Sequence, residues 1–226
     1  MTISKIAVYI TLFLCFACES GKEVTPEIIL PEPSSLEKIL KRCQELNILM
    51  AVDECFLDFV PSPEKYTLKE YLETYDNLFL LKAFTKRYAM AGVRLGYGLC
   101  GNKGLLEKIE GVCQPWNVSS MAQSAGLAAL QEREYVEKGR QVTFQELAYL
   151  KEELTALGYP VYPSQANYVF FTGPADLYEK LEQKKILIRD CSNYTGLSKG
   201  YYRVAVKEHE ENQQLVKALK EIERNR

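Results

Sequence analysis

Histidine is almost absent from this chain, since His209 is the only one among 226 residues. Serine–histidine triads and metal sites built on histidine therefore lack the residues to form them. An excess of charge of either sign is also missing, because the formal net charge is -2. The sequence contains neither a basic stripe nor an acidic tail, so we expect no nucleic-acid partner.

The cysteines form no disulfide or metal pattern. There are seven, an odd number scattered through apolar contexts, which indicates reduced thiols and predicts a cytoplasmic protein. The pair Cys15 and Cys18 has no second Cys or His pair behind it, so no metal site is expected. Long apolar runs are missing too. The uncharged apolar run Ile6–Ala17 is too short to span a membrane, so no membrane partner is expected.

Residues 1–26 form an atypical N-terminal segment with two interpretations. A short apolar core followed by Cys18 is typical of a signal peptide or a lipoprotein leader. The rival interpretation is a degenerate buried strand. We favour the strand, because a single lysine makes a poor charged region for a leader.

The stretch Ala83–Gly98, AFTKRYAMAGVRLGYG, carries the strongest chemical signal. It follows an apolar run, residues 77–82, that is typical of a buried strand, and it places Lys86 just past the strand end. Arg94 follows eight residues later, among three glycines that allow close backbone approach: Gly92, Gly96 and Gly98. A lysine can form a Schiff base with an aldehyde, and an arginine can bind phosphate oxygens. The pair therefore suits pyridoxal 5′-phosphate (PLP). The alternative is that Lys86 and Arg94 are two solvated surface cations, as most lysines and arginines are.

A second apolar run, from Ile48, leads into Asp53 and Glu54. This is typical of a strand buried on both faces that ends in a functional carboxylate. A PLP enzyme needs a carboxylate opposite the pyridine nitrogen, because a protonated nitrogen makes the ring an electron sink. Asp53 can supply that carboxylate.

Six ordered blocks of the sequence resemble the fold-type-I PLP enzymes: DECFLDFVP, FTKRYAMAGVRLGYG, QPWNVSS, QANYVF, ILIRDCSNY and YYRVAV. Within that group the chain is most similar to the threonine-phosphate decarboxylases of cobalamin biosynthesis, with histidinol-phosphate aminotransferases next. Six blocks in order are far more specific than one motif. The resemblance implies a partial chain that covers the C-terminal part of the fold, without the glycine-rich phosphate loop and the ring-stacking aromatic of the first half.

The resemblance assigns the cofactor residues. Asp53 would hold the pyridinium nitrogen, Lys86 the aldehyde, and Thr85 with Arg94 the phosphate. Phe56 replaces a tyrosine that aminotransferases commonly place against the ring hydroxyl, which fits the decarboxylases better. Outside these five positions, an alanine at residue 83 replaces a phosphate-binding serine, so the chain offers fewer hydrogen bonds to the cofactor.

Two arginines interrupt apolar strands further along. Arg203 lies in YYRVAV and Arg189 in ILIRDC, and a charge in a buried strand should meet an anion or an acidic partner. An outward-facing position is the alternative, more so for Arg189. By resemblance, Arg203 binds the substrate carboxylate, Arg189 lies by the substrate phosphate, and Asn167 lines the same pocket.

The pattern of elements predicts an α/β fold with a mainly parallel sheet, because helical and strand-like segments alternate over residues 27–114. We expect that range to be the C-terminal part of the PLP-binding large domain. Residues 115–226 would form a small α/β domain, including a long helix over residues 121–157 with a break near Gly139. Strands are expected over residues 94–100, 160–171 and 186–191, helices over 34–47 and 103–112, and a short helix over 68–74.

By resemblance, the reaction is PLP-dependent decarboxylation of L-threonine O-3-phosphate to (R)-1-amino-2-propanol O-2-phosphate. Lys86, freed when the substrate amine takes its place, would return a proton after CO2 leaves. Two alternatives stay open: a histidinol-phosphate aminotransferase, and a truncated, catalytically silent homologue. Fold-type-I sites are built at a two-fold interface, so a homodimer is expected.

Overall fold

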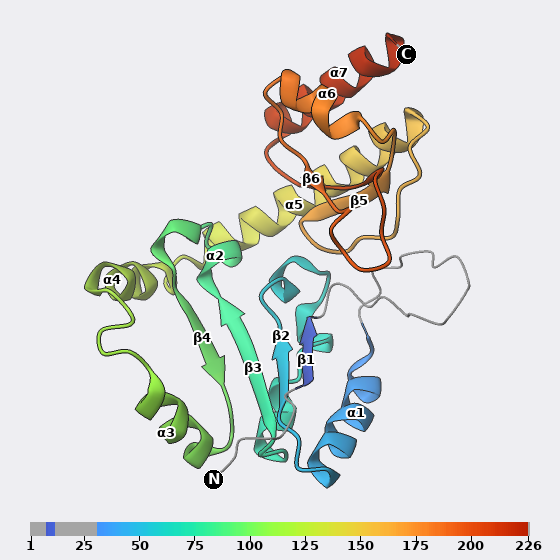
Figure 1. Cartoon of the computed structure of the whole chain (residues 1–226). Coiled ribbons are helices and arrows are strands. Elements are labelled where there is room, and N and C mark those ends of the chain that lie inside the picture. Colours follow the sequence, from blue (N-terminus) through green and yellow to red (C-terminus); the bar gives the residue numbers. More distant parts are fainter. Residues whose placement is uncertain (1–7, 12–30, 226) are drawn as a thin grey trace. The chain divides into compact units, whose positions relative to one another are not determined.

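The computed structural model describes residues 8–11 and 31–225 (Figure 1). These residues form two compact units, one of residues 8–11 and 31–137 and one of residues 138–225. The division falls inside a long helix, whereas the sequence analysis placed the start of the small domain at residue 115. In the described ranges, no helix combines the length and the apolar character needed to cross a membrane.

The first unit contains a four-stranded sheet in the order β1-β2-β3-β4. Its strands are β1 (Val8–Thr11), β2 (Met50–Asp53), β3 (Leu78–Ala83) and β4 (Gly96–Leu99). The pairs β1–β2 and β2–β3 are parallel, and β4 pairs antiparallel with β3. The expected α/β fold with a mainly parallel sheet is confirmed. Val8–Thr11 is a strand, as favoured for that stretch, and the rest of residues 1–26 lies outside the described residues.

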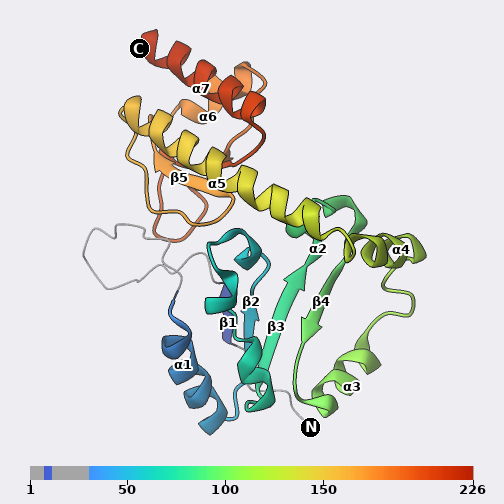
Figure 2. The same cartoon turned by 180° about the vertical axis from the view of Figure 1, so that it is seen from behind.

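One face of β2 and β3 is fully buried. It presents Met50, Val52, Leu78 and Leu80, each with no exposed surface. Helix α1 (Pro33–Glu45) buries Leu36, Leu40 and Cys43. Figure 2 and Figure 1 agree that α1 lies toward the β1 edge and α3 (Lys103–Val112) toward the β4 edge.

The helix ends differ in detail from expectation. Helix α1 starts at Pro33 without a side-chain cap, rather than behind Ser34 or Ser35, because proline fits the first turn of a helix. Helix α3 has the expected bounds, and the Asn102 side chain accepts a hydrogen bond from the N–H of Leu105 at 3.0 Å. The other short elements before α3 are η1 (Leu57–Phe59), η2 (Pro63–Lys65), η3 (Lys69–Glu73), α2 (Phe84–Arg87) and η4 (Ala91–Val93). The short helix expected over residues 68–74 is thus a 3-10 helix.

Strand β4 begins two residues later than expected, because Arg94 has a left-handed backbone with φ 57° and ψ 47°. The glycines near it do not all serve a ligand. A Cβ on Gly98 would lie 2.2 Å from Cζ of Phe79, and one on Gly96 would lie 3.0 Å from the Lys82 carbonyl oxygen. These two glycines let β4 pack against β3, which corrects the idea that they open the backbone to a ligand.

We expect Gly98→Ala to lower the free energy of unfolding by about 1–3 kcal/mol, because the added methyl group would overlap the Phe79 ring. Gly92→Ala is the matched control, since nothing lies within 4 Å of a Cβ there. Urea unfolding followed by circular dichroism measures both. Equal midpoints for the two variants would contradict this account of β4.

The long helical stretch is divided earlier than expected. It forms α4 (Ser120–Ala129) and α5 (Arg133–Ala156), with the break at residues 130–132 and Gly139 inside α5. A single glycine costs a helix only about 1 kcal/mol, which a 24-residue helix tolerates. Helix α4 stays with the first unit because it packs closely there: a Cβ on Gly126 would lie 2.5 Å from Cδ2 of Leu95.

The second unit has a three-stranded antiparallel sheet in the order β5-β7-β6. Its elements after α5 are β5 (Tyr168–Thr172), α6 (Leu177–Gln183), β6 (Arg189–Asp190), β7 (Tyr201–Ala205) and α7 (His209–Arg224). Leucines of α5, α6 and α7 form one core with Val169, Phe171, Tyr202 and Val204 of the sheet. The strands expected at 160–171 and 186–191 are shorter than predicted. Pro160 and Pro163 precede β5, and only an isolated bridge at Val161 joins them to the sheet.

Candidate active site

The parallel register brings Asp53 and Lys86 to the same edge of the first sheet. Asp53 ends β2 opposite Leu81 of β3. Strand β3 ends at Ala83, and helix α2, which contains Lys86, follows directly. Carboxyl ends of parallel strands meet at one sheet edge, where α/β proteins commonly bind ligands.

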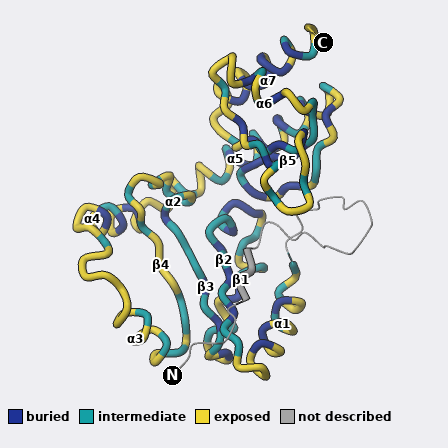
Figure 3. The backbone as a smooth tube through the Cα atoms, viewed as in Figure 1, coloured by how far each residue is buried: buried dark blue, intermediate teal, exposed yellow. Residues whose placement is uncertain are grey.

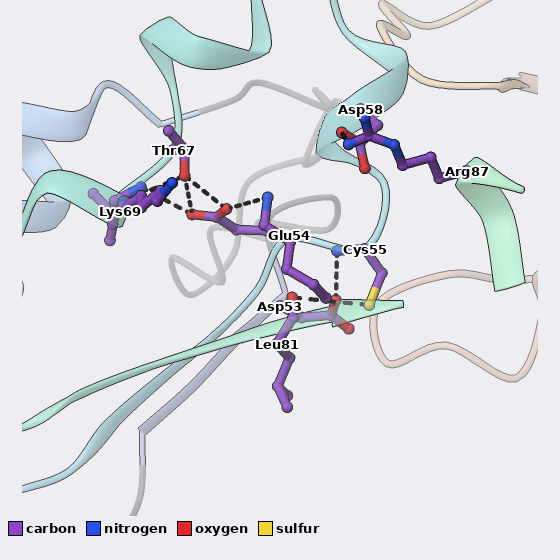
Figure 4. Close-up of polar contacts among 10 residues, drawn as sticks. Asp53, Glu54, Cys55, Asp58, Thr67, Lys69, Leu81 and Arg87 are labelled. Carbon is purple, nitrogen blue, oxygen red and sulfur yellow. Dashed lines mark hydrogen bonds and ion pairs between the residues drawn. The ribbon is translucent and has the colours of Figure 1, made fainter. Parts of the chain in front are cut away.

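Lys86 is an exposed amine beside an aromatic ring. Its Nζ lies 5.4 Å from the centre of the Phe56 ring, and no carboxylate among the described residues pairs with it. The next residue, Arg87, is bound to Asp58 at 2.8 Å and so ties α2 to the segment after β2 (Figure 4). The helix is thereby held while Lys86 remains available.

Arg94 reaches the same edge because β4 runs antiparallel to β3. The N–H of Phe84 donates to the Leu95 carbonyl at 3.1 Å, which joins α2 to the start of β4. The Arg94 side chain is exposed, and its Nη1 donates to the Ala91 carbonyl at 3.2 Å. Thr85 is half-buried in α2, which lies against η4. The three predicted residues Thr85, Lys86 and Arg94 therefore share one edge with Asp53.

Cys55 adds a thiol to this edge. Its N–H donates to Oδ1 of Asp53 at 2.9 Å. Burial, followed by the hydrogen bond and the charge of Asp53, raises the pKa of the Cys55 thiol to about 12, against the opposing charges of Lys82 and Lys86. The thiol therefore stays protonated at neutral pH and is a poor nucleophile toward an aldehyde.

In the second unit, the register places two arginines directly opposite one another. Arg189 of β6 pairs with Arg203 of β7, and Phe170 of β5 is the neighbour of Arg203 on its other side. Residues opposite each other in a ladder share a face, and this face is the one away from the core of α5, α6 and α7. Two like charges opposite one another are destabilising, so an anion bound between them would stabilise the pair.

The arginines contact aromatic rings, and of the two partners expected for them, an anion or an acidic residue, the described residues supply no acidic one. Arg203 is half-buried with its Cζ 4.9 Å from the centre of the Tyr168 ring, and Arg189 is exposed with its Cζ 5.7 Å from the Tyr194 ring. Arg189 Nη2 also donates to Asn193 Oδ1 at 3.2 Å. In residues 31–225, neither guanidinium pairs with an Asp or Glu.

Asn167 lies at the start of β5, beside Tyr168. Its backbone carbonyl accepts from the N–H of Val206 at 2.9 Å, while its side-chain Oδ1 is buried and has no hydrogen-bond partner among the described residues. A buried polar atom without a partner is uncommon and calls for an explanation such as a ligand. Burial raises the pKa of Tyr168 to about 12, against the charge of Arg203.

Two groups were missed by the sequence analysis. The Asp58–Arg87 ion pair holds α2, and the Glu54 carboxylate is fully buried and bound to Lys82 at 2.7 Å. Glu54 had been noted only as part of the strand end. Nothing in the sequence distinguishes these charges from surface charges, because their pairing depends on the register of β2 and β3.

The class I and II aminotransferase family matches residues 26–219, which is most of the sequence. The chain belongs to this family. It is 34% identical over 215 residues to a threonine-phosphate decarboxylase from Salmonella typhimurium, covering 93% of this chain and 57% of that one. It is 35% identical over 195 residues to a histidinol-phosphate aminotransferase from Nitratidesulfovibrio vulgaris, covering 85% and 51%.

Among solved structures, the histidinol-phosphate aminotransferase from Clostridium acetobutylicum has a TM-score of 0.85 at 29% identity, covering 97% of this chain and 64% of that one. The chain thus spans about half the length of the curated relatives named above. The predicted fold type is confirmed. The two enzyme families predicted from the sequence are both found, at nearly equal identity, so a class I and II PLP enzyme fold is established without a choice between them.

PLP is the cofactor of this aminotransferase family. The residues present fit it: the exposed amine of Lys86 and the guanidinium of Arg94 have no carboxylate partner in the described residues, and Asp53 lies at the same sheet edge. The amine can bind the aldehyde of PLP, the guanidinium group its phosphate, and the carboxylate its ring nitrogen.

Proposed function

We propose that this chain carries the PLP-binding lysine and the substrate-binding arginines of a threonine-phosphate decarboxylase. The observation that carries the proposal is the cross-strand pair Arg189 and Arg203, which has no acidic partner in the described residues. L-Threonine O-3-phosphate has a carboxylate at one end and a phosphate at the other. Two guanidinium groups suit two such anions, with Arg203 on the carboxylate and Arg189 on the phosphate.

The roles in the first unit follow from its chemistry. Lys86 would hold the aldehyde, Asp53 the ring nitrogen, and Thr85 with Arg94 the phosphate. Bound PLP supplies an electron sink for the electron pair left when CO2 departs. Lys86 would deliver the proton that completes the product, since an amine at this position can act as a general acid. Asn167 would donate a hydrogen bond to the substrate carboxylate from its side-chain NH2 group, while its buried Oδ1 can accept only from a donor such as an N–H or O–H group.

Phe56 is the feature that favours a decarboxylase over an aminotransferase. A phenylalanine cannot donate a hydrogen bond to the ring hydroxyl, and its ring lies beside Lys86. The near-equal identity to a histidinol-phosphate aminotransferase keeps transamination as the second candidate. A catalytically silent homologue that does not bind PLP is the third.

The experiment supplies phosphothreonine and PLP, without any keto acid, to the chain. A second sample is a fusion protein, in which the chain is joined to the part of the Salmonella typhimurium enzyme that the match does not cover. We expect CO2 release with formation of 1-amino-2-propanol O-2-phosphate. A requirement for 2-oxoglutarate and consumption of histidinol phosphate would establish the aminotransferase instead, and failure of both samples to bind PLP would establish a silent homologue.

The proposal extends to the whole protein. Residues 27–114 would belong to the PLP-binding large domain and residues 115–226 to the small domain, in a cytoplasmic homodimer. Support for an interface comes from exposed apolar side chains in the first unit, where Figure 3 marks β4, α3 and much of α4 as exposed. These exposed apolar side chains lie within residues 97–135: Tyr97, Leu106, Val112, Trp116, Met121, Leu127, Leu130 and Tyr135. A subunit interface would cover these side chains.

A further inference from the structure

Glu54 is a completely buried carboxylate with every oxygen bound (Figure 4). Its Oε1 accepts from the N–H of Leu68 at 2.9 Å and from the Thr67 hydroxyl at 3.2 Å. Its Oε2 accepts from the same hydroxyl at 2.9 Å and pairs with Lys82 Nζ at 2.7 Å. The site is therefore built around the carboxylate, and Lys82 is its only cationic partner in the described residues.

The pair joins two neighbouring strands. Asp53 is opposite Leu81 in the parallel ladder, so Glu54 and Lys82 follow as the next positions, and the Glu54 N–H donates to the Leu81 carbonyl at 3.0 Å. The side chain of Lys82 is only 16% exposed. Replacing a buried ion pair by apolar side chains often leaves stability unchanged or improves it, so stability alone is a weak reason for this pair.

Lys82 is also the lysine closest in sequence to Lys86, four residues before it. Lys82 is the last residue but one of β3, and Lys86 lies in α2, which follows β3 directly, so both lysines lie at the same end of that strand. They differ in their partners. Lys82 is bound to a buried carboxylate, whereas Lys86 contacts only the Phe56 ring among the described residues.

We propose that Glu54 determines which lysine reacts with an aldehyde, by holding Lys82 as a bound ammonium ion. The inference rests on the proposed PLP function of Lys86. Condensation needs a neutral amine: its nitrogen attacks the aldehyde carbon, protons pass to the oxygen, and water leaves. An ammonium ion bound to a carboxylate has no free lone pair. Without Glu54, the Lys82 side chain loses the ion pair at 2.7 Å that holds its Nζ, so the amine is released to react.

The test maps covalent labels after incubation with PLP. Borohydride delivers a hydride to the imine carbon and converts each lysine–PLP imine to a stable secondary amine, which peptide mass spectrometry locates. In the unaltered chain we expect label on Lys86. In Glu54→Gln we expect the labelled share of Lys82 to rise by about tenfold or more. Circular dichroism of the same sample, with its urea unfolding midpoint, shows whether the variant is folded, so that a rise caused by unfolding is recognised.

A second variant keeps Glu54 and does not depend on how Glu54→Gln folds. In Lys86→Ala, Lys82 should remain unlabelled although the favoured amine is gone, and adding Glu54→Gln to this variant should label it. Strong label on Lys82 in Lys86→Ala alone, or none on Lys82 in a folded Glu54→Gln, overturns the inference. Neither result touches the proposed function, which fails separately if the unaltered chain carries no label on Lys86.

Discussion

Replacing Arg203 by alanine is expected to lower the rate of CO2 release from phosphothreonine by roughly 30- to 4,000-fold. This corresponds to an activation barrier raised by about 2–5 kcal/mol. The guanidinium is half-buried over the Tyr168 ring and has no acidic partner among residues 31–225, so its charge is available to the substrate carboxylate. Bound PLP would supply the electron sink, and a substrate held at both ends by Arg203 and Arg189 would have little freedom to present a different bond for cleavage. The loss should appear as a lower kcat as well as a higher KM for phosphothreonine.

Two further variants serve as controls for the Arg203→Ala result. Arg189→Lys keeps a positive charge near the phosphate and removes only the bidentate hydrogen bonding of the guanidinium group, so we expect a much smaller loss of rate. Arg42→Ala removes an exposed arginine of α1 whose partner is Glu45, and it should leave the rate unchanged. A rate for Arg203→Ala equal to that of Arg42→Ala would contradict the assignment of the carboxylate site. The assay is the one described for the proposed function.

Replacing Lys86 by alanine is the second change with a large expected effect. Loss of proton transfer alone should slow CO2 release by about 10²- to 10⁴-fold, and the attachment point of the cofactor is lost as well. Lys41→Ala, an exposed lysine of α1, is the matched control and should keep full activity. Activity of Lys86→Ala close to that of Lys41→Ala would show that another group does the chemistry.

The placement of Asp53 and Lys86 at one edge of the sheet could be predicted because it depends on local signals. Apolar runs ending in Asp53 and just before Lys86 are read directly from the sequence, and parallel strands then bring both ends together. The bounds of α3 also follow from local capping by Asn102. Where a polar residue directly follows an apolar run, the sequence is sufficient to place that residue at a strand end.

The remaining features depend on contacts between distant residues. The glycine at 98 was expected to face a ligand, and only the position of Phe79 reveals its packing role. The division at residues 130–132, in place of Gly139, depends on the packing of α4. The pairing of Arg189 with Arg203, and of Glu54 with Lys82, follows from strand register, which depends on which strands pair and not on the paired residues alone.

The most direct test of the account is the position of the covalent label in the unaltered chain. The chain is incubated with PLP, reduced with borohydride, digested, and mapped by peptide mass spectrometry. We expect one pyridoxyl group, on the peptide that contains Lys86. Label on a different lysine, or no label at saturating PLP, would contradict the assignment of the cofactor site.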